Sequence, residues 1–312
     1  LVPARKHPGK FYALPQAPQQ FKQLLMASGF DRYFQIAPCF RDEDARADRS
    51  PGEFYQLDME MAFASQEDVF EVLEAVLPPI FAEYGKYSRA SEAPFKRIPY
   101  AEALEKYGTD KPDTRFGMEI VDMTDLMREC SFSVFRKCVE AGGVVRAINV
   151  KGGEAFPRAT IDELGAEAVR FGAKGMAWIA LRKDGSINSI LPKYFSEETF
   201  AAILARAGAE NGDLIVFCAD RLETVRRVLG QLRLRAADLL KLRDPAKFNF
   251  LFVTDFPEFE FSEEEGRFVA MHHPFTMPCE EDLPYLESDP ARVRAQAYDA
   301  VLNGVELGSG SV

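Results

Sequence analysis

The side chains best suited to binding an anionic ligand lie in one charged segment, between Phe40 and Glu60. Arginines and carboxylates are interspersed from Arg41 to Arg49, and aromatic, amide and acidic side chains follow. A guanidinium is planar and permanently charged, so it can hold a phosphate or carboxylate through two hydrogen bonds. The segment therefore indicates a site for a large anion. The alternative is a solvated hairpin with surface ion pairs, each contributing about 0–1 kcal/mol.

Two strands must position these side chains. Apolar and polar residues alternate from Asp31 to Arg41 and again from Phe54 to Glu60, which predicts an antiparallel hairpin with one apolar and one polar face. Because side chains alternate along a strand, one face should carry Phe54, Gln56, Asp58 and Glu60. An aromatic ring there can stack on a base, Glu43 can accept from an exocyclic amine, and Gln56 with Asp58 can hold an ammonium.

Helices are predicted on both sides of the hairpin. Apolar spacing from Gln19 to Gly29 indicates a short helix, and Gln19 and Lys22 then lie one turn apart on one face. Beyond the hairpin, Ser65 and Asp68 have the spacing of a capping box that opens a second helix. The pair Pro78–Pro79 should break or kink that helix.

A second hairpin is predicted near the C-terminus. Asn303–Gly304 is a strong two-residue turn signal, and it sets Val301 opposite Glu306. Asp299 then lies diagonally from Glu306 on the same face, about 7–8 Å away along the backbone. Two carboxylates at this spacing can share Mg²⁺ with phosphate oxygens. Two exposed acids on a hairpin are the alternative.

Adjacent histidines, His272 and His273, form a further candidate. If they lie in a strand, they point to opposite faces, so at most one meets a given ligand. A structural or surface role is the alternative.

Composition excludes several classes. The chain has 312 residues, with 38 Lys and Arg against 49 Asp and Glu, giving a net charge of −11, which argues against a protein that coats nucleic acid. It contains no membrane-length apolar run and no charged-then-apolar leader. Five cysteines without Cys-x-x-Cys spacing favour free thiols in a reducing cytosol. We therefore expect a cytoplasmic protein that neither spans a membrane nor binds structural zinc.

The chain's organisation changes after residue 107. A turn-rich stretch around Asp110 leads into alternating strands and helices that continue to about Asp244. The strands are expected at Val144–Val150, Met176–Leu181 and Leu214–Cys218, and the helices at Glu163–Phe171, Thr199–Ala207 and Leu222–Leu232. The simplest organisation is a catalytic domain, residues 1–112 and 245–312, interrupted by an inserted α/β domain, residues 113–244.

Taken together, these motifs resemble the bacterial aspartyl-tRNA synthetases of class II. The matching stretches are Phe11 to Leu25, the hairpin from Phe40 to Glu60, His272 to Thr276, and Asn303 to Gly308. The resemblance implies an α+β fold, in which a class II antiparallel sheet flanked by helices is interrupted by an α/β domain shared with an amidotransferase subunit. It also implies ATP-dependent activation of L-aspartate to an adenylate and its transfer to the tRNA 3′ end.

Matched residue by residue, the resemblance implies these roles. Arg41 binds the α-phosphate and the amino-acid carboxylate, and is the catalytic residue. Glu43 and Phe54 hold adenine, and Glu306 also belongs to the ATP site. Gln19, Gln56 and Asp58 surround the substrate ammonium. Lys22 and one of His272 and His273 contact the aspartate side chain. Asp299 and Glu306 bind Mg²⁺, and the loop residues Asp44, Arg46, Asp48 and Arg49 meet the tRNA acceptor end.

The resemblance further implies a homodimer whose tRNA is tRNA(Asp), with tRNA(Asn) as a second acceptor left open. It places an N-terminal anticodon-binding domain and a C-terminal ATP-binding motif outside this sequence, so we expect the chain alone to be inactive. Two alternatives stay open: an asparaginyl-type synthetase or asparagine synthetase paralogue, and a non-catalytic binding fragment. Lys22 with the histidine pair favours an anionic substrate side chain over asparagine.

Overall fold

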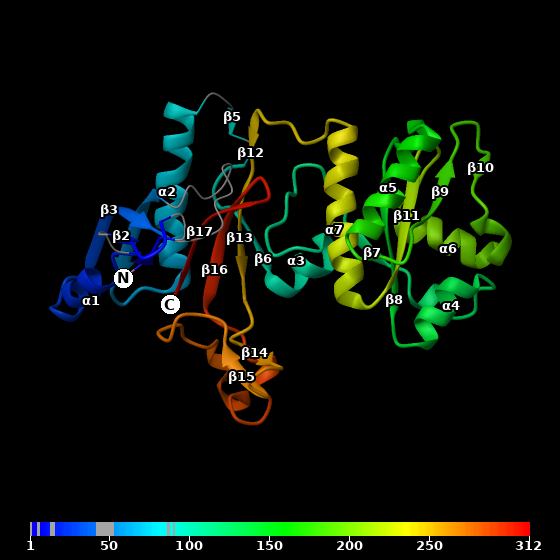
Figure 1. Cartoon of the computed structure of the whole chain (residues 1–312). Coiled ribbons are helices and arrows are strands. Elements are labelled where there is room, and N and C mark those ends of the chain that lie inside the picture. The colour runs from blue at the N-terminus through cyan, green and yellow to red at the C-terminus, as the bar shows by residue number, and fades with distance from the viewer. Residues whose placement is uncertain (1, 5–6, 13–15, 42–52, 86–87, 90) are drawn as a thin grey trace. The chain divides into compact units, whose positions relative to one another are not determined.

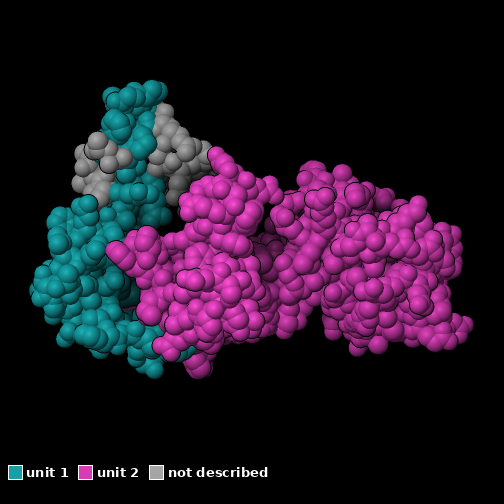
Figure 2. Space-filling model, turned by 90° about the horizontal axis from the view of Figure 1, so that it is seen from below, with its two compact units in different colours: residues 1–73 teal, residues 74–312 magenta. Residues whose placement is uncertain are grey.

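The computed structural model describes residues 2–4, 7–12, 16–41, 53–85, 88–89 and 91–312. The chain separates into two compact units, residues 1–73 and residues 74–312, coloured separately in Figure 2. Among the described residues, no helix combines the length and apolar content that a membrane crossing requires.

The first unit is built around the predicted hairpin. Strands β3 (Arg32–Phe40) and β4 (Glu53–Met61) pair antiparallel, from Arg32 opposite Met61 to Phe40 opposite Glu53 (Figure 1). The register keeps the apolar and polar faces separate, so the predicted hairpin is confirmed. The unit's other elements are β1 (Val2–Pro3), β2 (Phe11–Tyr12) and α1 (Gln19–Ala27).

Helix α2 (Gln66–Tyr84) begins with the predicted capping box. The Ser65 amide donates to Asp68 Oδ2 at 2.7 Å, and the Asp68 amide donates back to Ser65 Oγ at 3.4 Å. The helix continues through Pro78–Pro79, so the predicted break there is wrong. Packing outweighs the lost backbone hydrogen bonds, because the Phe81 ring in the following turn packs edge-on against the Phe248 and Phe250 rings, at 4.8 and 5.1 Å between ring centres.

In the second unit, a four-stranded sheet has the order β17-β16-β13-β6. Its strands are β6 (Lys96–Pro99), β13 (Phe250–Thr254), β16 (Ala297–Leu302) and β17 (Val305–Ser311). Strand β16 is antiparallel to both neighbours, and only β6 and β13 run parallel. The sheet packs with α3 (Tyr100–Tyr107) around a core that includes Ile98, Val253 and Val301. The structure thus has the predicted α+β fold.

Short elements complete this part of the second unit. They are β5 (Ser88–Arg89), β12 (Lys247–Phe248), β14 (Phe259–Ser262), β15 (Arg267–Ala270) and the 3₁₀ turns Glu280–Tyr285 and Pro290–Arg292. Strands β14 and β15 form a separate antiparallel hairpin.

Residues 113–244 contain a five-stranded sheet of order β10-β9-β11-β8-β7, with every pair antiparallel. Its strands are β7 (Ile120–Asp122), β8 (Val144–Val150), β9 (Ala177–Leu181), β10 (Ile187–Asn188) and β11 (Leu214–Asp220). The helices are α4 (Ser133–Glu140), α5 (Arg158–Arg170), α6 (Glu197–Ala207) and α7 (Leu222–Leu239), with 3₁₀ turns at Asp125–Met127, Gly153–Ala155 and Leu191–Tyr194. The predicted strands and helices are all present; α5 begins earlier and α7 ends later than expected.

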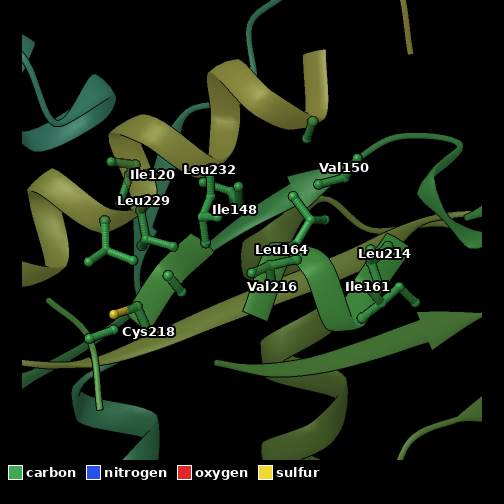
Figure 3. Packing of buried hydrophobic residues seen from close by; sticks show 14 of the residues in the cluster. Ile120, Ile148, Val150, Ile161, Leu164, Leu214, Val216, Cys218, Leu229 and Leu232 are labelled. Carbon is green, nitrogen blue, oxygen red and sulfur yellow. The ribbon is translucent and has the colours of Figure 1, made fainter. Parts of the chain in front are cut away.

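Both faces of this sheet are buried, which explains why its strands are almost wholly apolar. Leu214, Val216 and Cys218 of β11 face one cluster, together with residues of α5 and α7 (Figure 3). The intervening Ile215 and Phe217 face a second cluster on the opposite side. Each cluster draws only on residues between 118 and 240, so this segment has cores of its own.

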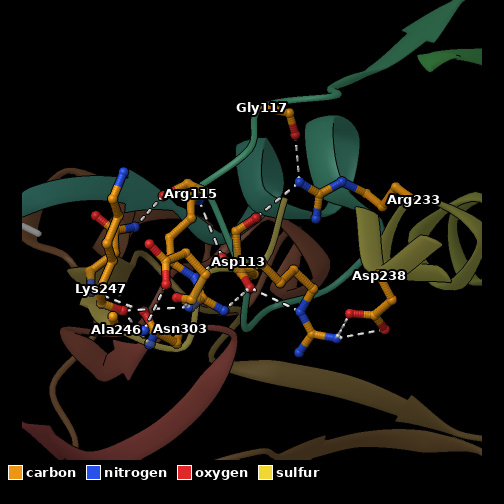
Figure 4. A network of polar contacts seen from close by, with 12 residues as sticks. Asp113, Arg115, Gly117, Arg233, Asp238, Ala246, Lys247 and Asn303 are labelled. Atoms are coloured by element: carbon orange, nitrogen blue, oxygen red, sulfur yellow. Dashed lines mark hydrogen bonds and ion pairs between the residues drawn. The ribbon is translucent and has the colours of Figure 1, made fainter. Parts of the chain in front are cut away.

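The two ends of the segment meet in a buried polar network (Figure 4). The Asp113 carboxylate, whose side chain is fully buried, accepts from Arg115 at 2.7 Å and from Arg243 at 3.3 Å. Arg233 of α7, also fully buried, donates to the backbone carbonyls of Asp113 and Gly117 at 2.9 and 2.6 Å. Burial lowers the pKa of Arg233 to about 10, which leaves it charged at neutral pH.

Candidate active site

In the first unit, the polar hairpin face gathers three charged side chains. Lys22, on the first turn of α1, places its Nζ 2.9 Å from Asp58 Oδ1 and 3.1 Å from Glu60 Oε2. Asp58 is almost fully buried, and its Oδ2 has no hydrogen-bond partner among the described residues. Burial tends to lower the pKa of Lys22, but the two carboxylates outweigh it and raise that pKa. The cluster therefore offers an ammonium beside a carboxylate that has one oxygen without a hydrogen-bond partner among the described residues.

Arg41 and Phe54 lie at the loop end of the same hairpin. The Arg41 guanidinium carbon is 5.1 Å from the centre of the Phe54 ring, within the range of a cation–π contact. Cys39 pairs with Phe54 across the hairpin, and its thiol approaches Gln56 Oε1 at 3.5 Å. Burial raises the pKa of Cys39. The strand register thus brings an aromatic ring, a guanidinium and an amide to one end of the polar face.

Of the other residues predicted in this region, Gln19 lies within the described part of the chain. Gln19 begins α1 and is half-buried, one turn before Lys22. The loop residues assigned to adenine and to the tRNA acceptor end lie outside the described residues. They are Glu43, Asp44, Arg46, Asp48 and Arg49.

In the second unit, the predicted carboxylate pair lies on β16 and β17. Val301 pairs with Glu306 as the turn signal predicts, but a bulge follows, so that Asp299 pairs with Ser309 instead of residue 308. The extra residue in β17 changes the register without separating the acids. One ammonium, Lys111 Nζ, lies 3.5 Å from Asp299 Oδ2 and 3.4 Å from Glu306 Oε2.

The donor set fits a hard divalent cation, because two carboxylates converge on one positive centre. Burial, reinforced by the charge of Glu306, raises the pKa of Asp299 to about 6 although Lys111 opposes the shift. A second cationic partner would therefore stabilise the ionised pair. Among the described residues, no group of three or more His, Cys, Asp or Glu side chains is arranged to hold a metal. The pair can thus supply only part of a coordination shell.

The two histidines line a hollow of about 250 Å³ that Asp299 also borders. They follow β15 and do not lie in a strand, so the strand geometry considered for them does not apply. His272 Nε2 lies 3.0 Å from the Pro257 carbonyl oxygen, and burial lowers its pKa. His273 is exposed, and its Nδ1 lies 3.4 Å from the Phe275 amide.

Ser309, Gly310 and Ser311 of β17 also line this hollow. At Gly310, an added Cβ would fall 2.2 Å from the Tyr298 hydroxyl oxygen, and Tyr298 is nearly buried. A side chain at Gly310 therefore cannot be accommodated unless Tyr298 moves. At Gly308, by contrast, an added Cβ would meet no atom within 4 Å.

Lys111 is a charged member of these clusters that sequence reasoning missed. It lies in the turn-rich stretch between α3 and β7, which was interpreted only as a domain boundary. The acidic residues next to Lys111 in the sequence were the one available indication that it belongs to a charged cluster. Its contact with two strands nearly 200 residues later cannot be predicted from the spacing of nearby residues.

Comparison with known proteins places these residues in a family. The model of the class II tRNA synthetases (D, K and N) matches residues 1–312. The aspartate–tRNA ligase of Ruminiclostridium cellulolyticum is 56% identical over all of this chain and 52% of its own length. The aspartate–tRNA(Asp/Asn) ligase of Lachnoclostridium phytofermentans is 53% identical, again over all of this chain and 52% of its own length. The chain thus spans about half the length of the curated relatives it matches.

Proposed function

Because the chain belongs to the class II tRNA synthetases (D, K and N), we propose that it is part of an aspartate–tRNA ligase. In this reaction, the α-carboxylate of L-aspartate attacks the α-phosphorus of ATP and pyrophosphate leaves. A terminal hydroxyl of tRNA then attacks the adenylate carbonyl, and AMP leaves. The protein's task is to align anions that repel each other and to stabilise charge on the phosphate oxygens.

The observation that carries this proposal is the charge pattern on the hairpin face. L-Aspartate presents one ammonium and two carboxylates. This face presents Asp58 and Glu60, and Lys22 of α1 contacts both, so acids are available for the ammonium and a cation for one carboxylate. Asp58 has an unused oxygen for the substrate ammonium, with Gln19 and Gln56 proposed as its neighbours. Lys22 is proposed to bind the substrate side-chain carboxylate. A ligand carrying a neutral amide gains less from an ammonium, which favours aspartate over asparagine.

Nucleotide contacts are proposed for each unit by itself. In the first unit, the contact between Arg41 and Phe54 supports a phosphate contact next to an adenine-stacking ring, and Glu43 is proposed to contact adenine as well. In the second unit, Asp299 and Glu306 are proposed to hold Mg²⁺, which neutralises phosphate charge when bound. The hollow beside the histidine pair is proposed to receive a polar part of the substrates.

The partners follow from the same assignment. We propose tRNA(Asp) as the acceptor, met by Asp44, Arg46, Asp48 and Arg49. Relatives carry two names, aspartate–tRNA ligase and aspartate–tRNA(Asp/Asn) ligase, so tRNA(Asn) is assayed beside it. We further propose a cytoplasmic homodimer for the whole protein.

Aspartate-dependent exchange of labelled pyrophosphate into ATP tests the proposal, using the full-length protein that contains this chain. Exchange that requires aspartate supports it. Absence of exchange in a folded, Mg²⁺-supplied preparation contradicts it. Charging of purified tRNA(Asp) and tRNA(Asn) by the same preparation then identifies the acceptor.

A further inference from the structure

A single ammonium lies between the two carboxylates to which Mg²⁺ has been assigned. Lys111 Nζ is 3.5 Å from Asp299 Oδ2 and 3.4 Å from Glu306 Oε2, but only 2.8 Å from Asp110 Oδ2. Its contacts with the strand acids are therefore looser than its contact with its sequence neighbour. The Asp299 side chain is 13% exposed, so the pair cannot rely on water alone to screen its repulsion.

We propose that Lys111 is a positioning residue for this carboxylate pair. Its ammonium is the internal cation that holds Asp299 and Glu306 together until a divalent cation replaces it. The inference rests on the proposed function insofar as that function assigns Mg²⁺ to the pair. When the divalent cation arrives, Lys111 gives up its two long contacts and keeps the short one to Asp110.

The loop that carries Lys111 is fixed from two sides, which keeps the ammonium in place. At its start, Gly108 packs so tightly on α7 that an added Cβ would fall 2.1 Å from the Arg226 carbonyl oxygen. At its end, the buried Asp113 lies against the β16–β17 turn, where a Cβ at Gly304 would be 3.0 Å from Asp113 Cβ. The loop is thus held against the same hairpin that carries the two acids.

The charges of the cluster show why replacing the Lys111 ammonium by a divalent cation is favourable. Asp110, Asp299 and Glu306 contribute three negative charges when ionised, and Lys111 contributes one positive charge. The cluster therefore keeps two uncompensated negative charges. A divalent cation cancels that excess, whereas an ammonium alone does not. Lys111 therefore stabilises the pair without filling its capacity to bind a cation. It also competes with the cation for the same oxygens.

Replacing Lys111 by Met removes the charge and keeps most of the stem, and it should have two effects of opposite sign. In EDTA, the melting temperature should fall by about 2–4 °C, because the two acids lose their common partner. In a Mg²⁺ titration followed by melting temperature, the half-maximal concentration should fall about three- to tenfold, because the competing cation is gone. Lys111→Arg keeps the charge and should resemble the wild type in both measurements.

Two further variants make the measurement specific. Lys106→Met removes an ammonium that pairs with Glu102 at 3.0 Å on α3, and should leave the Mg²⁺ midpoint unchanged. Asp299→Asn should abolish the Mg²⁺-dependent shift. These titrations contain no aspartate or tRNA, so a protein that shows the pattern but fails to activate aspartate refutes the proposed function alone.

The inference is overturned if Lys111→Met leaves the melting temperature in EDTA and the half-maximal Mg²⁺ concentration both at the wild-type level. It is also overturned if this variant weakens Mg²⁺ binding. It is equally overturned if the wild-type protein shows no Mg²⁺-dependent shift. Should Lys111→Met not fold, Lys111→Gln with Mg²⁺ binding measured by calorimetry provides the same comparison.

Discussion

Lys22 and Asp58 place opposite charges in contact on the polar face of the β3–β4 hairpin, 2.9 Å apart. A zwitterionic ligand can exchange this internal contact for one contact to each partner, so little charge is left uncompensated when it binds. The unused Asp58 Oδ2 marks where the ligand's ammonium would be accepted. At this scale, recognition depends on complementary charges that are already held in position.

In the proposed reaction, Arg41 is assigned to the reacting phosphate. Replacing Arg41 by Ala should lower the rate of aspartate-dependent pyrophosphate exchange at least about 100-fold, because a permanent positive charge on the reacting phosphate is lost. Arg32→Ala removes an exposed guanidinium from the start of the same strand and is the matched control. Near-normal exchange in Arg41→Ala, measured in the full-length protein, would contradict the role assigned to it.

Individual residues were predictable where their element was predictable. Asp58 and Glu60 were placed on one face because strand periodicity is local. Lys111 was not predicted, since its contacts with Asp299 and Glu306 depend on how a loop packs against a distant hairpin. Arg233 is charged and sits on a helix, so nothing in its local sequence signals that it is fully buried.

At the scale of elements, the Asn303–Gly304 turn fixed the start of the last hairpin, and Val301 pairs with Glu306 as predicted. The bulge beyond it has no local sequence signal, so the partner of Asp299 shifted by one residue. The continuation of α2 through Pro78–Pro79 was missed for a similar reason: packing of the Phe81 ring against residues far along the chain holds the helix together.

Asp113 joins the beginning and the end of the segment from residue 113 to residue 244. Asp113→Asn should lower the free energy of unfolding by about 3 kcal/mol, because the nearly buried Arg115 loses its counter-charge. Asp162→Asn breaks an exposed pair with Arg158 and should cost less than about 1 kcal/mol. Denaturant unfolding measures both. Equal effects in the two variants would contradict the structural role of Asp113.

The same carboxylate should give a defined pH dependence. Burial opposes ionisation of Asp113, but hydrogen bonds and charge from Arg115, with Arg243, hold its pKa below the ordinary value. A lowered pKa contributes stability that is complete above the ordinary value, about 3.9, and is lost as the pH falls through the folded-state pKa. The stability difference between wild type and Asp113→Asn should therefore be constant near neutral pH and shrink below about pH 4. A difference that grows with acidification would contradict this account.

At the scale of the whole molecule, residues 113–244 stay a proposed domain, and the location of the apolar cores is the observation behind that proposal. Two apolar clusters draw only on residues between 118 and 240, and a third uses only residues outside 113–244. Alternating strands and helices predicted this segment well, because each element's apolar pattern is local. Its antiparallel strand order could not be predicted, since pairing depends on contacts across many residues.

Residues 113–244 expressed alone should fold cooperatively, with a lower melting temperature than the same segment has in the full chain. The decrease is expected because Arg233 loses its contact with the Tyr107 ring, which lies 4.9 Å away in the full chain. Circular dichroism on heating measures both proteins. A broad, non-cooperative transition of the isolated segment would contradict its assignment as a domain.

Selection between aspartate and asparagine tests the central claim most directly. Pyrophosphate exchange by the full-length protein should be measured with each amino acid at equal concentration. Lys22 is proposed to bind the side-chain carboxylate, and it lies among acids that raise its pKa. We therefore predict at least about 100-fold faster exchange with aspartate than with asparagine at sub-saturating concentration. Equal exchange with the two amino acids, or exchange with neither, would contradict the account.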